Sequence, residues 1–409
     1  MKKIVKLSLA VAMMSGLGAV SAQADDGMNI ISDVKFKGQI RPRYQFTDID
    51  NANDSGHTLT NRTNLSISGK LLGVDGLGTT IELNSVNDFG TKDVGGVDIA
   101  KEATVAKMTQ ANVTYTTNGI TGVVGRMTVN LDNQRFIGSV GWKQNFQTLD
   151  LFGVIHRSDK LDYTAVYVYG VNAIGDAGNG TTGVDYTGGT TSGETSSVAL
   201  NASYKVMPEL KVTGYAYMLA SYSDTYGVAA TGKIDAGAKI SYRAEYAMQT
   251  GSTLEQVAGV KGDSSLKGNS MYYNIDVAAN ISGILLGANY EVLGAADTAD
   301  AKTSEFQTPL ATKHKFNGWA DQFLSTPSTG LVDMNLMAGY TNKTIGVAKV
   351  IYHSFTADDG GATYGSEIDF LLKKKVASNV TAMLKGAMYT ADTYNADTTK
   401  VWLMADYRF

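Results

Sequence analysis

Polar and apolar residues alternate with a period of two along most of the chain. In residues 34–46, VKFKGQIRPRYQF, apolar or small residues occupy the even positions and Lys, Arg or Gln the odd positions. The segments 58–72, 240–249 and 273–281 repeat this alternation. A period of two places successive side chains on opposite faces of a β-strand, so the pattern predicts strands with one apolar and one polar face. We count eighteen such strands, with sixteen as the alternative count.

The connections between these strands alternate in length. The short connections fall at 73–78, 118–119, 157–160, 207–209, 235–238, 282–283, 341–344 and 377–379. The long connections fall at 47–57, 88–104, 130–146, 174–196, 221–225, 250–269, 294–330, 356–365 and 391–398. Tight turns that alternate with long loops are typical of a transmembrane antiparallel up-and-down β-barrel, an all-β fold. A soluble sandwich would leave exposed edges, and a β-solenoid would show a short repeat that we do not find.

The last strand, VWLMADYRF, ends the sequence on an aromatic residue. Val401, Leu403, Tyr407 and Phe409 form one row of this strand, and we expect this row to face lipid. Pairing with the first strand would close the barrel, and the barrel-assembly machinery is the expected partner of this C-terminal strand. Pro42 interrupts the first strand, because it has no N–H to donate. We expect a bulge or a locally frayed ladder there.

The first 24 residues predict a secretory signal peptide, and residues 25–409 the outer-membrane barrel. A basic start at Lys2, Lys3 and Lys6 precedes an apolar stretch over residues 7–20 and a small-x-small cleavage site at residues 22–24. This arrangement is typical of an exported protein, and the apolar stretch is shorter than the roughly 20 residues of a spanning helix.

Composition narrows the choice of partners. The formal net charge of −4 disfavours nucleic acid, and the chain has no cysteine for disulfides or thiolate metal sites. The four histidines form no recognisable catalytic motif, so we expect no enzyme activity, no metal and no cofactor. The acidic loop residues Asp358, Asp359, Asp392 and Asp397 lack the spacing of a Ca²⁺ loop and are interpreted as solvated turns.

Two long connections are rich in aromatic residues. The first, over 130–146, contains Trp142 among Arg135, Lys143 and several amides, and the second, over 294–330, contains Phe306, Phe316, Trp319 and Phe323. Such residues are better placed inside the lumen of a wide barrel than in free solvent, so we predict two inward-folded constriction loops; the alternative is that both cap the outer mouth. The stretch FNGWADQFL in the second loop could form a short helix.

Charged residues at polar positions of the strands and in these loops are predicted to line the pore. Basic residues gather in the first 145 residues and acidic residues come later, an order that would place walls of opposite sign across the lumen. The predicted pore-lining and constriction residues are Arg41, Arg43, Arg62, Arg126, Arg135, Trp142, Lys143, Arg243, Glu245, Glu291, Asp333, Glu367 and Asp369.

Three stretches resemble the alginate-export-type and related major outer-membrane porins of Gram-negative bacteria. They are GRMTVNLDNQRFIGSVGWKQNFQTLD at 125–150, FQTPLATKHKFNGWADQFLSTPSTGLVDMN at 306–335, and the C-terminal YHSFTADDGGATYGSEIDFLLKKK with DTTKVWLMADYRF. The resemblance implies an eighteen-stranded channel in outer-membrane lipid, assembled as a homotrimer. It also implies lumen arginines that engage anionic solutes, a role that falls here on Arg126, Arg135, Lys143 and Trp142.

These observations favour a water-filled porin for passive diffusion of ions and small hydrophilic solutes. The alternative is a selective channel for anionic solutes such as organic acids or acidic oligosaccharides, including alginate. A plugged barrel that acts as an enzyme or adhesin is a third hypothesis. Block of the current by an anion separates the first two, and absence of conductance would indicate the third.

Overall fold

The computed structural model describes residues 30–50, 55–89, 92–93, 104–174, 193–254, 269–296 and 304–409. The predicted signal peptide lies outside these ranges. Within them the chain forms a single sheet in which each long strand pairs with the long strands before and after it, the two-residue β4 pairs with the start of β2, and β1 also pairs with β19. The sheet is therefore a closed antiparallel up-and-down barrel, as the alternation of polar and apolar residues predicted.

The described residues contain eighteen long strands, the two-residue β4 and one short 3₁₀ helix. The first nine long strands are β1 (Ile31–Ile49), β2 (Gly56–Leu71), β3 (Leu77–Asp88), β5 (Ala106–Thr117), β6 (Ile120–Met127), β7 (Thr148–His156), β8 (Leu161–Asn172), β9 (Gly193–Met207) and β10 (Leu210–Leu219). The other nine are β11 (Ser223–Asp235), β12 (Lys239–Gly251), β13 (Asn269–Ile281), β14 (Ile284–Leu293), β15 (Leu331–Asn342), β16 (Gly346–Thr356), β17 (Thr363–Ala377), β18 (Val380–Ala391) and β19 (Thr398–Arg408). β4 is Lys92–Asp93, and the 3₁₀ helix η1 is Lys313–Lys315. No helix in the described ranges is long and apolar enough to cross a membrane.

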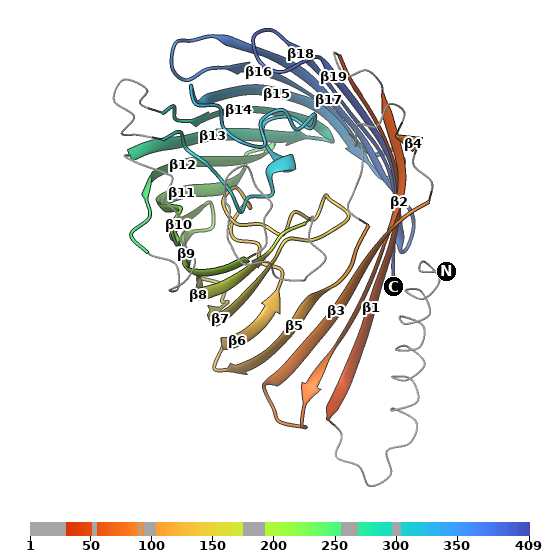
Figure 1. Cartoon of the computed structure of the whole chain (residues 1–409), viewed down its shortest axis with the longest axis vertical. Coiled ribbons are helices and arrows are strands. Elements are labelled where there is room, and N and C mark those ends of the chain that lie inside the picture. Colours follow the sequence, from red (N-terminus) through yellow and green to blue (C-terminus); the bar gives the residue numbers. More distant parts are fainter. Residues whose placement is uncertain are drawn as a thin grey trace.

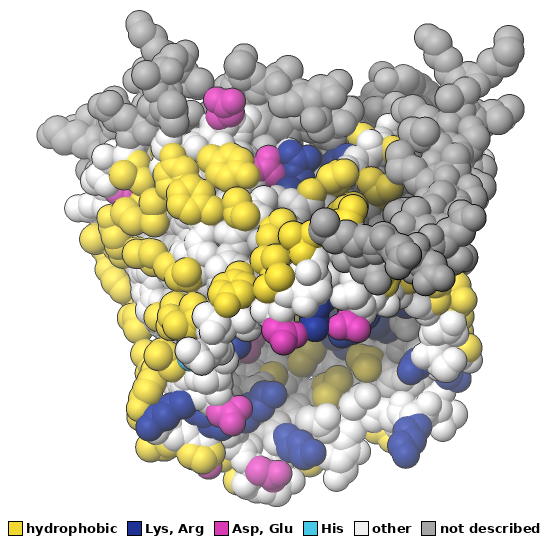
Figure 2. All heavy atoms as spheres, turned by 90° about the horizontal axis from the view of Figure 1, so that it is seen from below, with side chains coloured by type: hydrophobic (Ala, Val, Ile, Leu, Met, Phe, Trp, Pro, Cys, Tyr) yellow, Lys and Arg dark blue, Asp and Glu magenta, His cyan; other side chains and the backbone are white. Residues whose placement is uncertain are grey.

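The outer wall of the barrel is apolar because, of every two successive residues in a strand, the one that points outward is apolar. Leu336, Ile275 and Leu403, for example, are all more than half exposed. Figure 2 shows hydrophobic side chains over the wall, beside a hollow that holds basic and acidic side chains. A wall of this kind is typical of a barrel whose outer face meets hydrocarbon.

The C-terminal strand closes the barrel against β1. Gly38 and Phe409 exchange both backbone hydrogen bonds, with N···O distances of 2.8 and 3.0 Å. The Phe409 ring lies over Gly38, where a Cβ atom would collide with it, and has Phe36 and Tyr407 as aromatic neighbours. The terminal residue is thus held by pairing and by packing.

The ladder between β1 and β19 is interrupted at Pro42. Ile40 pairs with Tyr407 and Arg43 pairs with Met404, but the two intervening β1 residues have no partner in β19. The register is the same on both sides of the gap, so the ladder is frayed there without a bulge. The missing N–H of proline accounts for the interruption.

Two loops fill part of the lumen. The first inserted loop, residues 128–147, follows β6, and the second inserted loop, residues 304–330, precedes β15. Figure 1 shows both, in yellow and in cyan, inside the curve of the strands. The strands therefore act as a frame, and the loops provide the surfaces that narrow the barrel.

Candidate functional site: the constriction

The two inserted loops are hydrogen-bonded to each other as one unit. Gly138 N donates to Leu310 O at 2.9 Å, and Thr312 N donates to Gln134 O at 3.1 Å. The side-chain amide of Gln147 donates to the carbonyl oxygens of Gly138 and Leu310, at 2.9 Å each. Because these bonds satisfy backbone groups that water would otherwise solvate, the loops can fold together inside the barrel.

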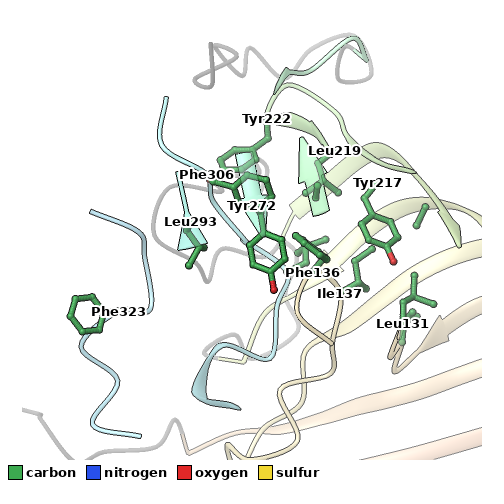
Figure 3. Close-up of a cluster of buried hydrophobic side chains, with 14 of the residues drawn as sticks. Leu131, Phe136, Ile137, Tyr217, Leu219, Tyr222, Tyr272, Leu293, Phe306 and Phe323 are labelled. Atoms are coloured by element: carbon green, nitrogen blue, oxygen red, sulfur yellow. The ribbon is translucent and has the colours of Figure 1, made fainter. Parts of the chain in front are cut away.

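An aromatic cluster packs the first loop against one wall. Phe136 lies 5.2 Å from the ring of Tyr215, 5.3 Å from Tyr272 and 5.9 Å from Phe306 of the second loop. Figure 3 shows Phe136 of the first loop beside Tyr272 of β13, with Ile137 and Tyr217 close by. Ring pairs at such distances add to the stability gained from burial. The inward-folded loops predicted from their aromatic content are thus present.

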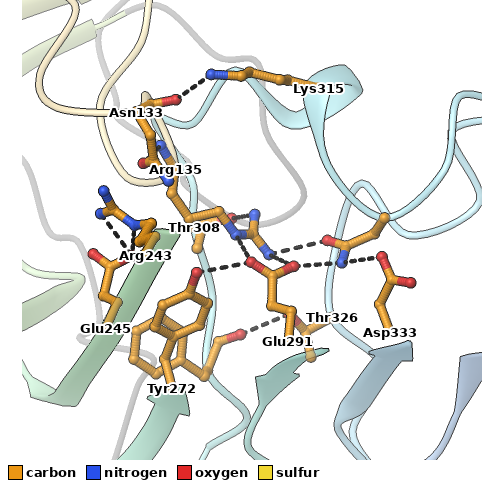
Figure 4. A network of polar contacts seen from close by, with 12 residues as sticks. Asn133, Arg135, Arg243, Glu245, Tyr272, Glu291, Thr308, Lys315, Thr326 and Asp333 are labelled. Carbon is orange, nitrogen blue, oxygen red and sulfur yellow. Dashed lines mark hydrogen bonds and ion pairs between the residues drawn. The ribbon is translucent and has the colours of Figure 1, made fainter. Parts of the chain in front are cut away.

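Arg135 is the central connection between the loops and the wall. Its Nε donates to Glu291 Oε1 on β14 at 2.8 Å, and its Nη2 donates to Asn317 Oδ1 at 3.0 Å (Figure 4). The Phe316 ring lies 4.8 Å from the guanidinium, and only 2% of Arg135 is exposed. Charge-assisted bonds of this kind fix geometry. Arg135 therefore lies in the constriction as a buried structural cation.

Three arginines of the first two strands hold the first loop. Arg41 donates to the carbonyl oxygens of residues 141–143 at 2.6 to 3.1 Å, and Arg43 donates to Trp142 O at 2.7 Å. Arg62 donates to Lys143 O at 3.3 Å and lies 4.4 Å over the Phe146 ring. All three point inward and contact the loop, Arg62 also donates to Gln39 Oε1 of β1 at 2.6 Å, and each of the three is less than 5% exposed.

The second loop rests on acidic residues of β15 and β17. Ala320 N donates to Glu367 Oε1 at 2.8 Å, and a Cβ atom at Gly318 would collide with the same carboxylate. Gly318 has a φ of +80°, which favours glycine. Asp369 and Asp333 flank His353, at 3.5 and 2.9 Å. These carboxylates are buried beneath the loop.

Arg243 and Glu245 form a buried pair on β12. Arg243 donates to Glu245 Oε2 and also to Asp132 of the first loop, while Tyr215 OH donates to Glu245 Oε1 at 2.8 Å. This pair adds a further attachment of the first loop to the wall. Its charges are neutralised locally.

Arg126 lies on the outer wall and differs in this from the prediction. It shares its face of β6 with Val124, which is 51% exposed, and it pairs in register with Ala111 and Asp150. Its guanidinium makes a bidentate ion pair with Asp150 at 2.7 and 2.8 Å. The prediction assumed that the polar face of β6 points into the lumen. In the structure the inward positions of β6 and β7 are apolar, so the polar side chain of Arg126 lies on the opposite face. Leu149 and Leu151 fill those positions beneath the first loop.

The short helix also differs from the expectation. The 3₁₀ turn covers Lys313–Lys315, whereas FNGWADQFL is a series of turns. Asn317, Gly318 and Asp321 all have positive φ angles, which an α-helix cannot contain. These angles place the tip of the loop on the wall.

A basic cavity of about 930 Å³ lies beside the constriction. Ser378 and Asn379 of a short turn belong to its lining, so it faces the short-turn end of the barrel. Seven of its lining side chains are basic, and one, Asp406, is acidic and pairs with Arg408. The basic residues are Arg41, Lys315, Lys349, Lys373, Lys375, Lys385 and Arg408.

None of the five lysines in this lining was among the predicted site residues. Lys373 and Lys375 are exposed. They lie on the same inward face of β17 as Asp369, since alternate residues of a strand share a face. Neither makes an ion pair with any other residue that the structure describes. The signal in the sequence is the run KKK at residues 373–375, but three consecutive lysines beside a turn do not by themselves reveal a cavity.

A second cavity of about 320 Å³ lies against the acidic wall. Asp276, Glu291 and Asp333 line it together with several asparagines. No group of three or more acidic, histidine or cysteine side chains in the described residues has the geometry to hold a metal ion. The arrangement thus offers polar and charged surfaces without a preformed metal centre.

Comparisons with known proteins find the same fold among solved structures. No family model and no curated protein matches the sequence. Solved structures do match. Acinetobacter baumannii OccAB2 is 15% identical in sequence and has a TM-score of 0.72, and the match covers 94% of this chain and 99% of OccAB2. Pseudomonas aeruginosa OpdK with vanillate matches at 12% identity and a TM-score of 0.71, covering 93% and 99%. The fold is the same. These neighbours are outer-membrane porins, and at such identities the likeness shows the fold alone.

Proposed function

We propose that the protein is an outer-membrane porin through which small hydrophilic solutes and ions diffuse passively, with a preference for carboxylate anions. The basic cavity carries this proposal. Its exposed lysines present a concentrated positive charge at the short-turn end, the periplasmic end of barrels of this type. A cluster of one sign within a low-dielectric wall attracts counter-ions and favours their passage.

The proposed solutes are small organic acids or acidic sugars. The cavity combines lysines with the indole rings of Trp142 and Trp319, so it offers both cations and flat apolar surfaces. One structural neighbour was solved with vanillate, an aromatic carboxylate. By this proposal the N-terminal 24 residues direct export and are removed, and no catalytic step takes place. A homotrimer and recognition of β19 by the barrel-assembly machinery stay predictions.

Charge reversal in the cavity tests the preference. We expect the triple change Lys349→Glu, Lys373→Glu and Lys375→Glu to move the reversal potential in a salt gradient toward the cation equilibrium potential. Lys374→Glu is the matched control, because Lys374 is also exposed on β17 but has the opposite parity. If the control and the triple variant shift equally, the cavity does not select ions.

A further inference from the structure

Lys385 on β18 is surrounded by all three tryptophans of the chain. Its Nζ lies 3.8 Å from the ring centroid of Trp319, 4.1 Å from that of Trp142 and 5.5 Å from that of Trp402. The rings come from the second loop, the first loop and β19, so three separate parts of the structure meet at one ammonium group. Only 6% of Lys385 is exposed. We call this arrangement the lysine cage.

His314 completes the lysine cage. Its imidazole stacks on Trp142, with ring centroids 4.7 Å apart, and its Nε2 lies 2.7 Å from Lys385 Nζ. An ammonium group has only donors, so Nε2 accepts, and the Nδ1–H donates to Asp321 Oδ1 at 2.6 Å. Burial, helped by the nearby cation of Lys385 and opposed by Asp321, lowers the pKa of His314 to about 3. The neutral ring is therefore the form that fits this chain of bonds.

We propose that Lys385 is a positioning residue that fastens both inserted loops to the barrel wall and so fixes the width of the constriction. Cation–π contacts are strongest when the cation is shielded from water, as it is here. The ammonium has its donors directed to His314 and to the ring faces, which leaves it poorly placed to bind passing anions. The inference goes beyond the proposed function, because it holds for whichever solute passes.

Lys349 provides a contrast within the same cavity. Its Nζ lies 5.3 Å from the Trp319 ring, but no such contact reaches Trp142 or Trp402. Lys349 therefore touches one loop only, while Lys385 joins two loops to the wall. If Lys385 served merely as one more cavity cation, the two residues would respond alike to neutralisation.

The test is Lys385→Met in the full mature protein, with Lys349→Met as the matched control. Because the chain's three tryptophans all lie in the lysine cage, tryptophan emission, excited at a wavelength that the 22 tyrosines do not absorb, reports on this site alone. We expect Lys385→Met to increase acrylamide quenching of tryptophan at least twofold and to split the single-channel current into several levels. Lys349→Met removes a cavity cation and is expected to change ion selectivity, but it should leave quenching near that of the wild type and keep a single current level. Lys385→Arg should restore a single level.

The opposite result would be wild-type quenching and a single current level in Lys385→Met, or equal changes in both lysine variants. Should Lys385→Met fail to fold, Trp319→Phe replaces it, because phenylalanine keeps an aromatic face but binds a cation less strongly. The same changes, smaller in size, are then expected, and their absence would overturn the proposal. Quenching does not require conduction, so its outcome stands even if the barrel proves not to be a porin.

Discussion

The arginines that contact the first inserted loop donate to carbonyl and carboxylate groups of the protein. Arg41, Arg43 and Arg62 bind loop carbonyl groups, and Arg135 binds Glu291. Removing one partner of such a buried pair leaves the other charge without compensation. At the scale of single residues, the constriction therefore depends on buried arginines whose charge the protein itself engages, while the exposed basic residues of the cavity include Lys373 and Lys375.

The pair Arg135 and Glu291 should show this dependence in a double-mutant cycle. Arg135→Met alone is expected to lower the free energy of unfolding by about 3–5 kcal/mol, because it leaves the buried carboxylate of Glu291 without its cationic partner. Arg135→Met with Glu291→Met should lose less than the single change. Urea unfolding in lipid vesicles measures both, and simple addition of the two single effects would contradict the pairing.

Acid should weaken the attachment of the loops at His314. The pKa of packed His314 is about 3, lowered by burial, whereas an unpacked histidine has a pKa near 6.5. The contribution of His314 is complete above pH 6.5 and is lost as the pH falls toward 3, because only the detached ring takes up a proton. The groups facing the ring are Lys385, Asp321 and Lys143. Acrylamide quenching should rise between pH 7 and 4 in the wild type and much less in His314→Asn.

The sequence predicts which strand residues point into the barrel. It does not predict which of these inward residues are exposed to water. Arg41, Arg43 and Arg62 were placed on the correct face, because parity is a local property of a strand. Their burial depends on a loop about 100 residues further along the chain, which parity does not reveal. Arg126 was misplaced because leucines beneath that loop made the inner face of β6 and β7 apolar.

At the scale of elements, the two inserted loops form one unit that rests on the wall at a few points. Their aromatic content predicted insertion, since rings of this kind avoid free solvent. The residues that make the contacts were not predictable, because the loops have no periodic pattern. The expected helix over residues 316–324 failed for the same reason: positive φ angles at Asn317, Gly318 and Asp321 serve contacts to distant strands.

Gly318 offers a test of the contact between the second loop and β17. We expect Gly318→Val to push the loop away from Glu367 and to change the single-channel conductance, because the new side chain would occupy the place of the carboxylate. Gly360→Val is the control: Gly360 also has a positive φ, of +77°, but open space surrounds its Cβ position. An equal change in both variants would show that backbone strain, rather than this contact, is responsible.

The whole molecule presents an apolar outer wall and a polar inner one. Leu336 is 61% exposed on the outer face of β15, and the adjacent Asn335 faces the lumen. We expect Leu336→Arg to destabilise the folded barrel by about 2–4 kcal/mol in lipid, because a cation near the middle of the bilayer is costly. Asn335→Arg should cost much less, as its side chain enters the lumen. Equal losses would contradict the assignment of the lipid-facing side.

The barrel was the most predictable feature at this scale. Periodicity identified the strands, and the alternation of short and long connections identified the meander, so closure between β1 and β19 followed. The distribution of charge across the lumen was harder to predict. Glu367 and Asp369 lie on the same wall as the exposed lysines, but the second loop covers them, and the free charge of that wall is positive.

Single-channel recording of the mature protein in a planar bilayer would show whether the barrel conducts and whether it prefers anions. The account predicts ohmic current steps, a reversal potential that favours anions in a salt gradient, and concentration-dependent block by small carboxylates such as vanillate. Block should be stronger from the short-turn side, where the basic cavity lies. A folded protein that carries no current, or a channel that prefers cations and ignores carboxylates, would contradict it.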